Sequence, residues 1–428
     1  MSSRGREIFK ALRAEREERR KRQDSIANYL EPNLKFGAGG LRDIEQALAL
    51  RKLFADAFRD ADPYPFEVLA EIKEELLYLR CYLHLLRSGD VLTAQDQLEL
   101  ARRLNMGSAR ELMTFIQSEL ERASFYADWV VAYGAASRKA RGNAHETFSS
   151  LNDVLYKLRE NPSVFRQFEI RRTVNDWFKP LSAVEIGRAL QRALYEPQDD
   201  AYLVGLYRTR LLEGFLPEFK QIRGLVQHDH YHRFTVDAHL VQTLREVQRA
   251  QSSLKGRTWG AVGKLAKELG PHDWWVLKLT ALFHDLAKGR KGDHSSEGAK
   301  LVDKYFAQWE YPEGLREDVR WLVDNHLILS TAAFRQNPQA QSTWKRLFER
   351  GVEGRRLTWL ALFTAIDIRS TNPEAWTDWK AQLLYDLVQN LRSPRAQSLQ
   401  RTSSTRPGPS SKARRTGFLR STRFCWSL

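Results

Sequence analysis

Cysteine is nearly absent from this chain of 428 residues, which contains only Cys81 and Cys425. Two such distant thiols offer neither a disulfide framework nor a cysteine-based metal site. Also missing are runs of about 18 apolar residues, which a membrane-spanning helix needs. The opening segment MSSRGREIFK lacks an apolar signal sequence. We therefore predict a cytoplasmic protein that has no membrane partner.

Acidic residues are outnumbered, and the formal net charge is +15. Residues 392–428 carry nine Lys/Arg and no acidic residue, and residues 1–24 carry nine basic against five acidic residues. The chain between them, 25–391, is therefore almost neutral. Basic ends can bind nucleic acid, but these ends have neither interleaved aromatic residues nor a base-reading motif. We predict solvated ends and no nucleic-acid partner.

Strand-like alternation is scarce, whereas apolar residues recur at helical spacing along most of the chain. Residues 67–86, for example, place Val68, Ile72 and Leu76 on one helix face. We predict an all-α protein. The expected parts are a charged N-terminal helix at 1–24, one helical region at 25–225, a second helical region at 226–391 and a basic tail at 392–428.

The composition changes abruptly after Leu391. The segment that follows is rich in Ser, Arg and Pro and has no apolar periodicity, which predicts disorder. The segment could be a genuine tail or the out-of-frame end of a truncated gene. Because the change directly follows a well-patterned helix, we favour the second interpretation.

His284 and Asp285 interrupt the apolar run LTALFHDLA at 279–287. Burying two titratable groups is costly unless something pairs or coordinates them. His239 and Asp367 interrupt two other apolar helical segments in the same way. Imidazole and carboxylate groups without thiolate suit Mn, Fe, Zn or Mg, and a binuclear site is possible. We predict that these four residues bind the metal.

Three further polar residues accompany this set. Lys288 follows His284 by one helical turn, where it could meet a phosphate oxygen. His294 lies in a polar loop, and His326 lies near the end of an apolar helical segment. We predict catalytic roles for all three, the histidines as ligands of a second metal or as phosphate contacts. Taken alone, a buried histidine is more often a hydrogen-bonded core residue, and Asp367 could pair with Arg369.

Several segments carry a resemblance to a known family. They are EPNLKFGAGGLRDIEQAL (31–48), HDHYHRFTVDAH (228–239), LFHDLAKGRKGDHSSEGA (282–299), VDNHLILSTAAFR (323–335) and TAIDIRSTNPEAWTDWKAQLL (364–384). The pattern H…HD…D resembles that of the HD phosphohydrolase superfamily. The longer motifs resemble the central part of the bifunctional PII uridylyltransferase/uridylyl-removing enzyme family. The resemblance spans roughly residues 25–390. It implies a helical linker domain at 25–225, followed at 226–391 by an HD-type phosphohydrolase domain, a helical bundle with a buried metal site.

The resemblance implies a metal-dependent phosphodiesterase that hydrolyses the UMP–tyrosine ester on the nitrogen-regulatory PII protein. Uridylylated PII would then be the substrate and partner. The resemblance also places Asp237 and His232 beside the first metal histidine. Two alternatives stay open: an HD hydrolase of another nucleotide or phosphoester, and a non-catalytic remnant that binds PII.

The chain also departs from the family. The transferase half of the family needs Gly-Ser followed by Asp-x-Asp to hold Mg²⁺, and no such motif precedes Glu31. Asp60 and Asp62 form an Asp-x-Asp pair without an upstream Gly-Ser. The glutamine-sensing ACT domains of the family are not found either. We therefore expect neither transferase activity nor intrinsic glutamine sensing, and we interpret GAGGLRD (37–43) as a structural helix start.

Overall fold

The computed structural model describes residues 3–21, 29–136, 147–226, 234–252 and 257–404. Within these ranges the chain is helical and forms no β-strand, apart from isolated bridges that join Tyr29 to Phe234 and Asn33 to Val91. The all-α prediction is confirmed. None of the described helices combines the length and the apolarity that crossing a membrane requires.

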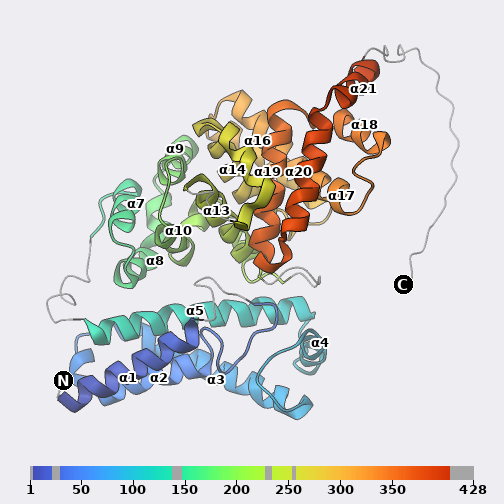
Figure 1. Cartoon of the computed structure of the whole chain (residues 1–428). Helices are drawn as coiled ribbons and strands as arrows, with labels where there is room; N and C mark the ends of the chain where they lie inside the picture. Colours follow the sequence, from blue (N-terminus) through green and yellow to red (C-terminus); the bar gives the residue numbers. More distant parts are fainter. Residues whose placement is uncertain (1–2, 22–28, 137–146, 227–233, 253–256, 405–428) are drawn as a thin grey trace, which may run out of the picture.

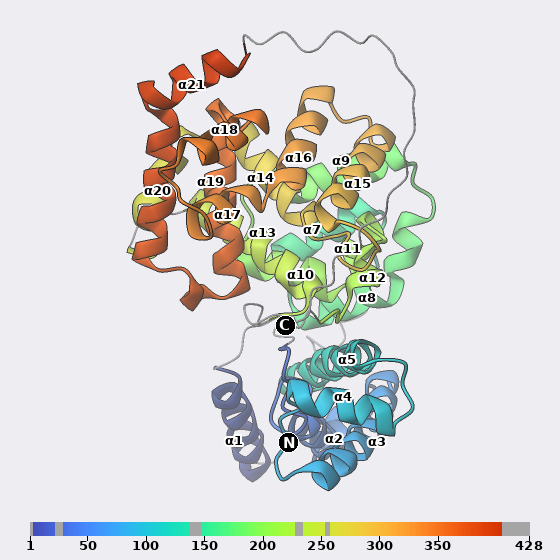
Figure 2. The same cartoon turned by 90° about the vertical axis from the view of Figure 1, so that its right-hand side faces the viewer.

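The first helices share one apolar core and lie together at the blue end of the molecule (Figures 1 and 2). Capping explains where two of them begin. Thr93 and Ser108 each accept a hydrogen bond from a backbone N–H in the first turn of the helix that follows. The elements are α1 Ser3–Arg20, α2 Leu41–Leu53, the 3₁₀ turn η1 Ala55–Phe58, α3 Tyr64–Leu86, α4 Ala94–Arg103 and α5 Ala109–Ala135.

The remaining helices form a larger body around a second core. Its first part contains α7 Leu151–Glu160, α8 Val164–Phe178, α9 Ala183–Leu194, α10 Asp200–Arg208, α11 Leu211–Phe215, α12 Phe219–Ile222 and α13 Val236–Ser252. Its second part contains η2 Arg257–Glu268, α14 Pro271–Phe283, α15 His294–Gln308, α16 Glu313–Asn325, α17 Ile328–Phe334, α18 Gln341–Glu349, α19 Gly354–Thr371, η3 Pro373–Ala375, α20 Asp378–Arg392 and α21 Pro394–Ser404.

The packing divides the chain at a different place from the predicted boundary after residue 225. Apolar side chains of α7 to α12, such as Leu158 and Leu190, belong to the same core as Leu282 and Phe363. Contact between the parts is close, because a Cβ added at Gly187 on α9 would lie 2.5 Å from Cβ of Trp309. Residues 151–225 therefore pack as part of the bundle.

Lys278 joins the two parts of this larger core. Its side chain is buried on α14, and Nζ donates hydrogen bonds to the carbonyl oxygens of Leu194, Tyr195 and Glu196 at 2.9, 2.9 and 3.2 Å. These carbonyls lie at the end of α9, where a helix leaves its last acceptors without partners. Burial lowers the pKa of Lys278 to about 8.

We predict that Lys278→Met lowers the free energy of unfolding by about 2 kcal/mol, because buried carbonyls lose a charged donor while the apolar stem is kept. Urea denaturation followed by circular dichroism would measure the change. Lys300→Met is the matched control, since Lys300 is largely exposed and pairs only across one helical turn with Glu297. Equal stability of the two variants would show that the Lys278 bonds do not stabilise the fold.

The segment after Leu391 is helical at its start, so the prediction of disorder is wrong for residues 394–404. Pro394 occupies the first helical position, and Ser393 Oγ accepts a hydrogen bond from the backbone N–H of Ala396. Ala396 is buried in the large core, and α21 packs on α18 and α20. The rest of the predicted tail, 405–428, lies outside the described residues.

The glycine-rich segment 37–43 is a loop that lies in close contact with helix α5. Gly39 has φ +73°, and a Cβ there would lie 1.8 Å from the carbonyl oxygen of Leu120 on α5. Gly40 is the N-cap of α2, and the N–H of Gly39 donates to Asp43 Oδ2 at 2.9 Å. This geometry supports the interpretation of the segment as a structural helix start.

Candidate metal centre

Three packed helices bring the first group of donor atoms together. His239 lies on α13, His284 follows the last residue of α14, and Asp367 lies in the last turns of α19. Helix α13 packs against both α14 and α19, which places these side chains in one buried spot. The structure thus unites three of the four predicted ligands.

The donor atoms of this group converge closely. His239 Nε2 lies 3.2 Å from His284 Nε2 and 3.0 Å from Asp367 Oδ1, and His284 Nε2 lies 3.5 Å from the same oxygen. All three donor atoms lie within 4.8 Å of one another, which suits ligation of one metal ion.

A second group forms beside the first. Asp285 Oδ1 lies 3.6 Å from His294 Nε2 and 3.9 Å from His326 Nε2. His294 begins α15, and His326 caps the end of α16. These three residues also offer donor atoms within 4.8 Å of one another. His294 and His326 therefore occupy positions suited to ligands of a second metal.

Asp285 faces both groups. Its Oδ2 lies 3.6 Å from His239 Nε2 and 3.5 Å from His284 Nε2, while Oδ1 faces the second group. Oδ1 is buried and has no hydrogen-bond partner among the described residues. Helix α14 ends at Phe283, so His284 and Asp285 lie in a turn and not inside a helix as the sequence suggested.

Backbone carbonyls set the tautomers of two of the rings. His284 Nδ1 lies 3.2 Å from the carbonyl oxygen of Ala281, and His326 Nδ1 lies 2.8 Å from that of Val323. A carbonyl can only accept, so each Nδ1 carries a proton and each Nε2 is turned toward the cluster. Both rings are thus oriented as metal ligands.

Burial and neighbouring charges shift the pKa values in the centre. Burial, together with the facing His284, lowers the pKa of His326 to about 4, and burial lowers that of His239. Burial opposes ionisation of Asp285, but Lys288 and the histidines hold its pKa well below the usual range. At neutral pH the centre therefore presents an anionic Asp285 and neutral rings at His239 and His326, the protonation states that a metal requires.

These residues fit a divalent cation. The cluster offers four imidazoles and two carboxylates and no thiolate, a donor set that suits Mn, Fe, Zn or Mg. The buried Oδ1 of Asp285, without a hydrogen-bond partner among the described residues, would gain a partner if a cation bound there. Lys288 Nζ lies 2.7 Å from Asp285 Oδ2 and stands at the edge of the cluster.

A cavity of about 570 Å³ opens beside the two groups. Asp285, Lys288, His294, His326 and Asp367 form its floor. The other wall residues lie in segments 323–335 and 364–384, and their type and spacing did not predict a role for them. These additional residues include Leu327, Ser330, Phe334, Arg335, Thr371, Trp379 and Lys380. The wall is partly apolar and carries an exposed indole at Trp379, together with two cations.

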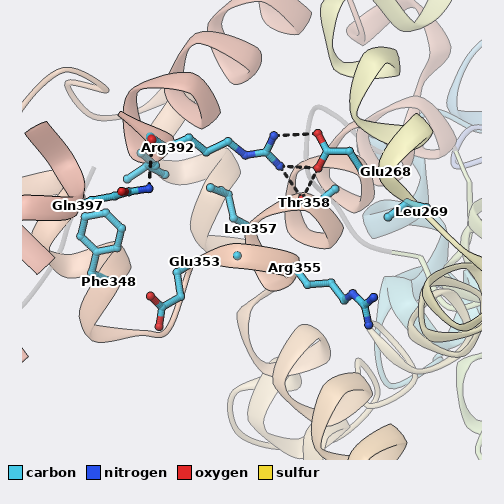
Figure 3. A pocket seen from close by; sticks show the side chains of 11 residues that line it. Glu268, Leu269, Phe348, Glu353, Arg355, Leu357, Thr358, Arg392 and Gln397 are labelled. Atoms are coloured by element: carbon cyan, nitrogen blue, oxygen red, sulfur yellow. Dashed lines mark hydrogen bonds and ion pairs between the residues drawn. The ribbon is translucent and has the colours of Figure 1, made fainter. Parts of the chain in front are cut away.

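A separate hollow lies between α18, α19 and α21, and none of its lining residues belongs to the histidine cavity. Figure 3 shows the guanidinium of Arg392 directed at Glu268, with Thr358 beside the pair. Arg392 donates to both carboxylate oxygens of Glu268 at 2.8 Å. This hollow holds an ion pair that ties α20 to the end of η2 and contains no group of histidines.

Other predicted site residues lie elsewhere. Asp237 is buried and accepts hydrogen bonds from the Tyr207 hydroxyl at 2.8 Å and the Gly224 N–H at 3.1 Å, so it ties α13 to α10 and the end of α12. Arg369 pairs with Glu246 at 3.0 Å, and Asp367 contacts the histidines. His232 lies outside the described residues.

Comparison with family models gives the class of the protein. Residues 257–361 match the HD domain, and this range includes His284, Asp285, His294 and His326. Residues 7–125 match the family described as GlnD PII-uridylyltransferase. The chain thus contains a segment similar to the HD domain, and an earlier segment similar to PII-uridylyltransferase.

Curated relatives make the relation more specific. The chain is 29% identical to the bifunctional uridylyltransferase/uridylyl-removing enzyme of Aromatoleum aromaticum, over 89% of this chain and 49% of that protein. It is 31% identical to the enzyme of the same name from Chromobacterium violaceum, over 89% of this chain and 50% of that protein. The resemblance to this enzyme family is confirmed, and the chain spans about half the length of these relatives. The match to the HD domain supports a hydrolase of the phosphohydrolase type.

Proposed function

We propose that this chain is a metal-dependent phosphodiesterase of the uridylyl-removing type, which releases UMP from the modified tyrosine of PII. The observation that carries the proposal is the pair of adjoining donor groups joined by Asp285 at the floor of a cavity. Similarity to uridylyl-removing relatives supports the choice of substrate. A divalent cation, when bound, supplies Lewis acidity and lowers the pKa of water.

We assign the following roles to the side chains of the centre. His239, His284 and Asp367 would hold one cation, and His294 and His326 would hold a second. Asp285 would serve both cations, since its two oxygens face different groups. This assignment moves the two histidines from the predicted catalytic set to the ligands.

Lys288 would act on the phosphoryl group. Its ammonium lies in the cavity wall, where it would stabilise negative charge that develops on the phosphoryl oxygens. The ion pair with Asp285 Oδ2 holds the ammonium at the edge of the metal cluster. The partly apolar wall with Trp379 would receive an aromatic part of the substrate.

We propose further that transferase activity is absent from this chain. Asp62 of the Asp-x-Asp pair is bound to Arg172 at 2.7 Å and to the N–H of Tyr64 at 2.9 Å. Its carboxylate is thus committed to two contacts with the protein, and no Gly-Ser precedes it.

Incubation of the full chain with uridylylated PII and Mn²⁺ tests the proposal. We expect UMP to appear, detected by chromatography, and PII to lose the mass of one UMP group per tyrosine. Chelation with EDTA should stop the release, and added Mn²⁺ should restore it. His272→Asn is the matched control, since His272 is exposed and lies outside the cluster.

Two other results would point to the alternative functions. Hydrolysis of free nucleotides or simple phosphodiesters, with uridylylated PII left intact, would favour an HD hydrolase with another substrate. Absence of any hydrolysis, together with less than about one metal ion per chain after purification without chelators, would favour a module that only binds PII.

A further inference from the structure

A second large cavity lies where helices α1 to α5 meet the larger helical body. It measures about 790 Å³ and is lined by residues of α3, α5, α8, α11 and α12. Figures 1 and 2 both show α8 next to α5 at this junction. None of its lining residues belongs to the cavity of the metal centre.

Cations dominate the wall of this cavity. Six cationic side chains line it: Arg122, Arg171, Arg172, Arg210, Lys220 and Arg223. The acidic residues in the wall are Asp62, Glu119 and Glu213. These cations come from α5, α8 and the segment 210–223, so the cluster is assembled only by the fold.

The carboxylates do not balance the cations. Arg172 pairs with Asp62, Arg122 with Glu119, and Arg223 with Glu213. The partly buried Glu121 behind the wall is shared, because Arg171 binds both of its oxygens at 2.6 and 2.9 Å and Arg210 lies 3.3 Å from one of them.

Four carboxylates thus pair with six cations, and the nearby Asp237 also acts on Arg223, which still leaves an excess of positive charge in a concave, partly buried space. Such a space attracts anions, because the low-dielectric walls concentrate the field.

The pKa shifts of Arg210 and Arg223 agree with this charge excess, whereas carboxylate partners raise the pKa of Arg122 and Arg171. Burial, followed by repulsion from Arg210, lowers the pKa of Arg223 to about 10. Burial and the nearby Arg171 lower that of Arg210 as well. Charged partners normally raise the pKa of a guanidinium, so both groups would gain from an additional anion.

The backbone at Arg210 is also unusual. Arg210 has φ +66°, a left-handed conformation that residues other than glycine rarely adopt. Strain of this kind is often kept where a side chain must be held for a ligand. Tyr64, which is 46% exposed, Tyr126 and Phe168 add aromatic surface to the same cavity.

We infer that this cavity is a binding site for a phosphate or phosphoester anion, separate from the metal centre. Arginine guanidinium groups suit this ligand, because their planar N–H donors match phosphate oxygens in pairs. Arg171 and Arg210 share the single carboxylate of Glu121, Arg223 adds a further guanidinium, and Lys220 adds an exposed cation at the rim.

Calorimetric titration of the full, EDTA-treated chain with inorganic pyrophosphate tests this inference. We expect saturable binding, and a dissociation constant raised about tenfold or more in Arg210→Gln and in Arg223→Gln. Arg320→Gln should bind as the unchanged chain does, because Arg320 lies on the exposed side of α16 and pairs with Asp303. Lys288→Gln should bind equally well, which separates this site from the metal centre.

Folding of the variants is checked by circular dichroism, and Lys220→Gln provides a change at an exposed position that leaves the buried network intact. Weaker binding in Lys220→Gln would support the inference even if the buried variants misfold. Titration with UMP and with ribose 5-phosphate then distinguishes a nucleotide ligand, which binds more tightly with its base, from a simple phosphate. No saturable binding at millimolar pyrophosphate, or binding unchanged in folded Arg210→Gln, Arg223→Gln and Lys220→Gln, would overturn the inference.

Discussion

Replacing Asp285 by asparagine is expected to lower kcat/KM for UMP release about 10³-fold or more. Both carboxylate oxygens face histidine nitrogens at 3.5–3.9 Å, so one substitution weakens both donor groups at once. The amide keeps the shape of the side chain but removes its negative charge. The same variant should bind fewer metal ions per chain by plasma mass spectrometry.

The control for this experiment is Asp303→Asn, which changes an exposed carboxylate that pairs with Arg320 on the surface. It should retain the activity and the metal content of the unchanged chain. The Asp285 variant must also be shown to fold, because its carboxylate pairs with Lys288 in a buried position. A folded Asp285→Asn protein that releases UMP at the normal rate would refute the assignment of Asp285.

The candidate centre was largely predictable from the sequence for a physical reason. His239, His284 and Asp367 each interrupt an apolar helical stretch, and uncompensated polar groups are rare in such places. The sequence could not show how the ligands divide into groups. That division depends on α14 ending at Phe283, since the turn after it directs Asp285 toward both sets of histidines.

The sequence predicted that the helices exist, but it did not predict which helices pack against one another. The apolar stripe of α9 shows that the helix must pack on something, and the structure shows that Trp309 packs on it at Gly187. The domain boundary after residue 225 stays a prediction, because amphipathic periodicity contains no information about which core a helix joins. The cation-lined cavity could not be predicted from the sequence either, because the residues that line it are far apart along the chain.

Outside the metal centre, we expect the largest loss of stability when Asp43, at the end of the glycine-rich segment, is replaced. Its carboxylate is fully buried and binds Arg16, Arg19 and Arg20 of α1, and it also accepts the N–H of Gly39. Asp43→Asn leaves these arginines without their shared partner, which should lower the free energy of unfolding by about 3–5 kcal/mol.

Denaturation in urea at neutral pH measures this change. Asp56→Asn is the matched control, since Asp56 is exposed and pairs only with Arg59 across one helical turn, and its loss should be below about 1 kcal/mol. If Asp43→Asn and Asp56→Asn both lower the free energy of unfolding by less than about 1 kcal/mol, the ion pairs between Asp43 and the arginines of α1 do not stabilise the first core.

The pH dependence of stability gives an independent check on Asp43. Burial opposes its ionisation, but Arg20, Arg16 and Arg19 outweigh this effect and lower the pKa of Asp43 to about 2. Because the folded-state pKa lies below the unfolded value near 3.9, the carboxylate stabilises the fold above about pH 4. That contribution should disappear as the pH falls toward 2. The asparagine of Asp43→Asn does not titrate in this range, so this variant should lose less stability than the unchanged chain between pH 4 and 2. If both proteins lose the same free energy of unfolding over this range, Asp43 is not a stabilising carboxylate of the fold.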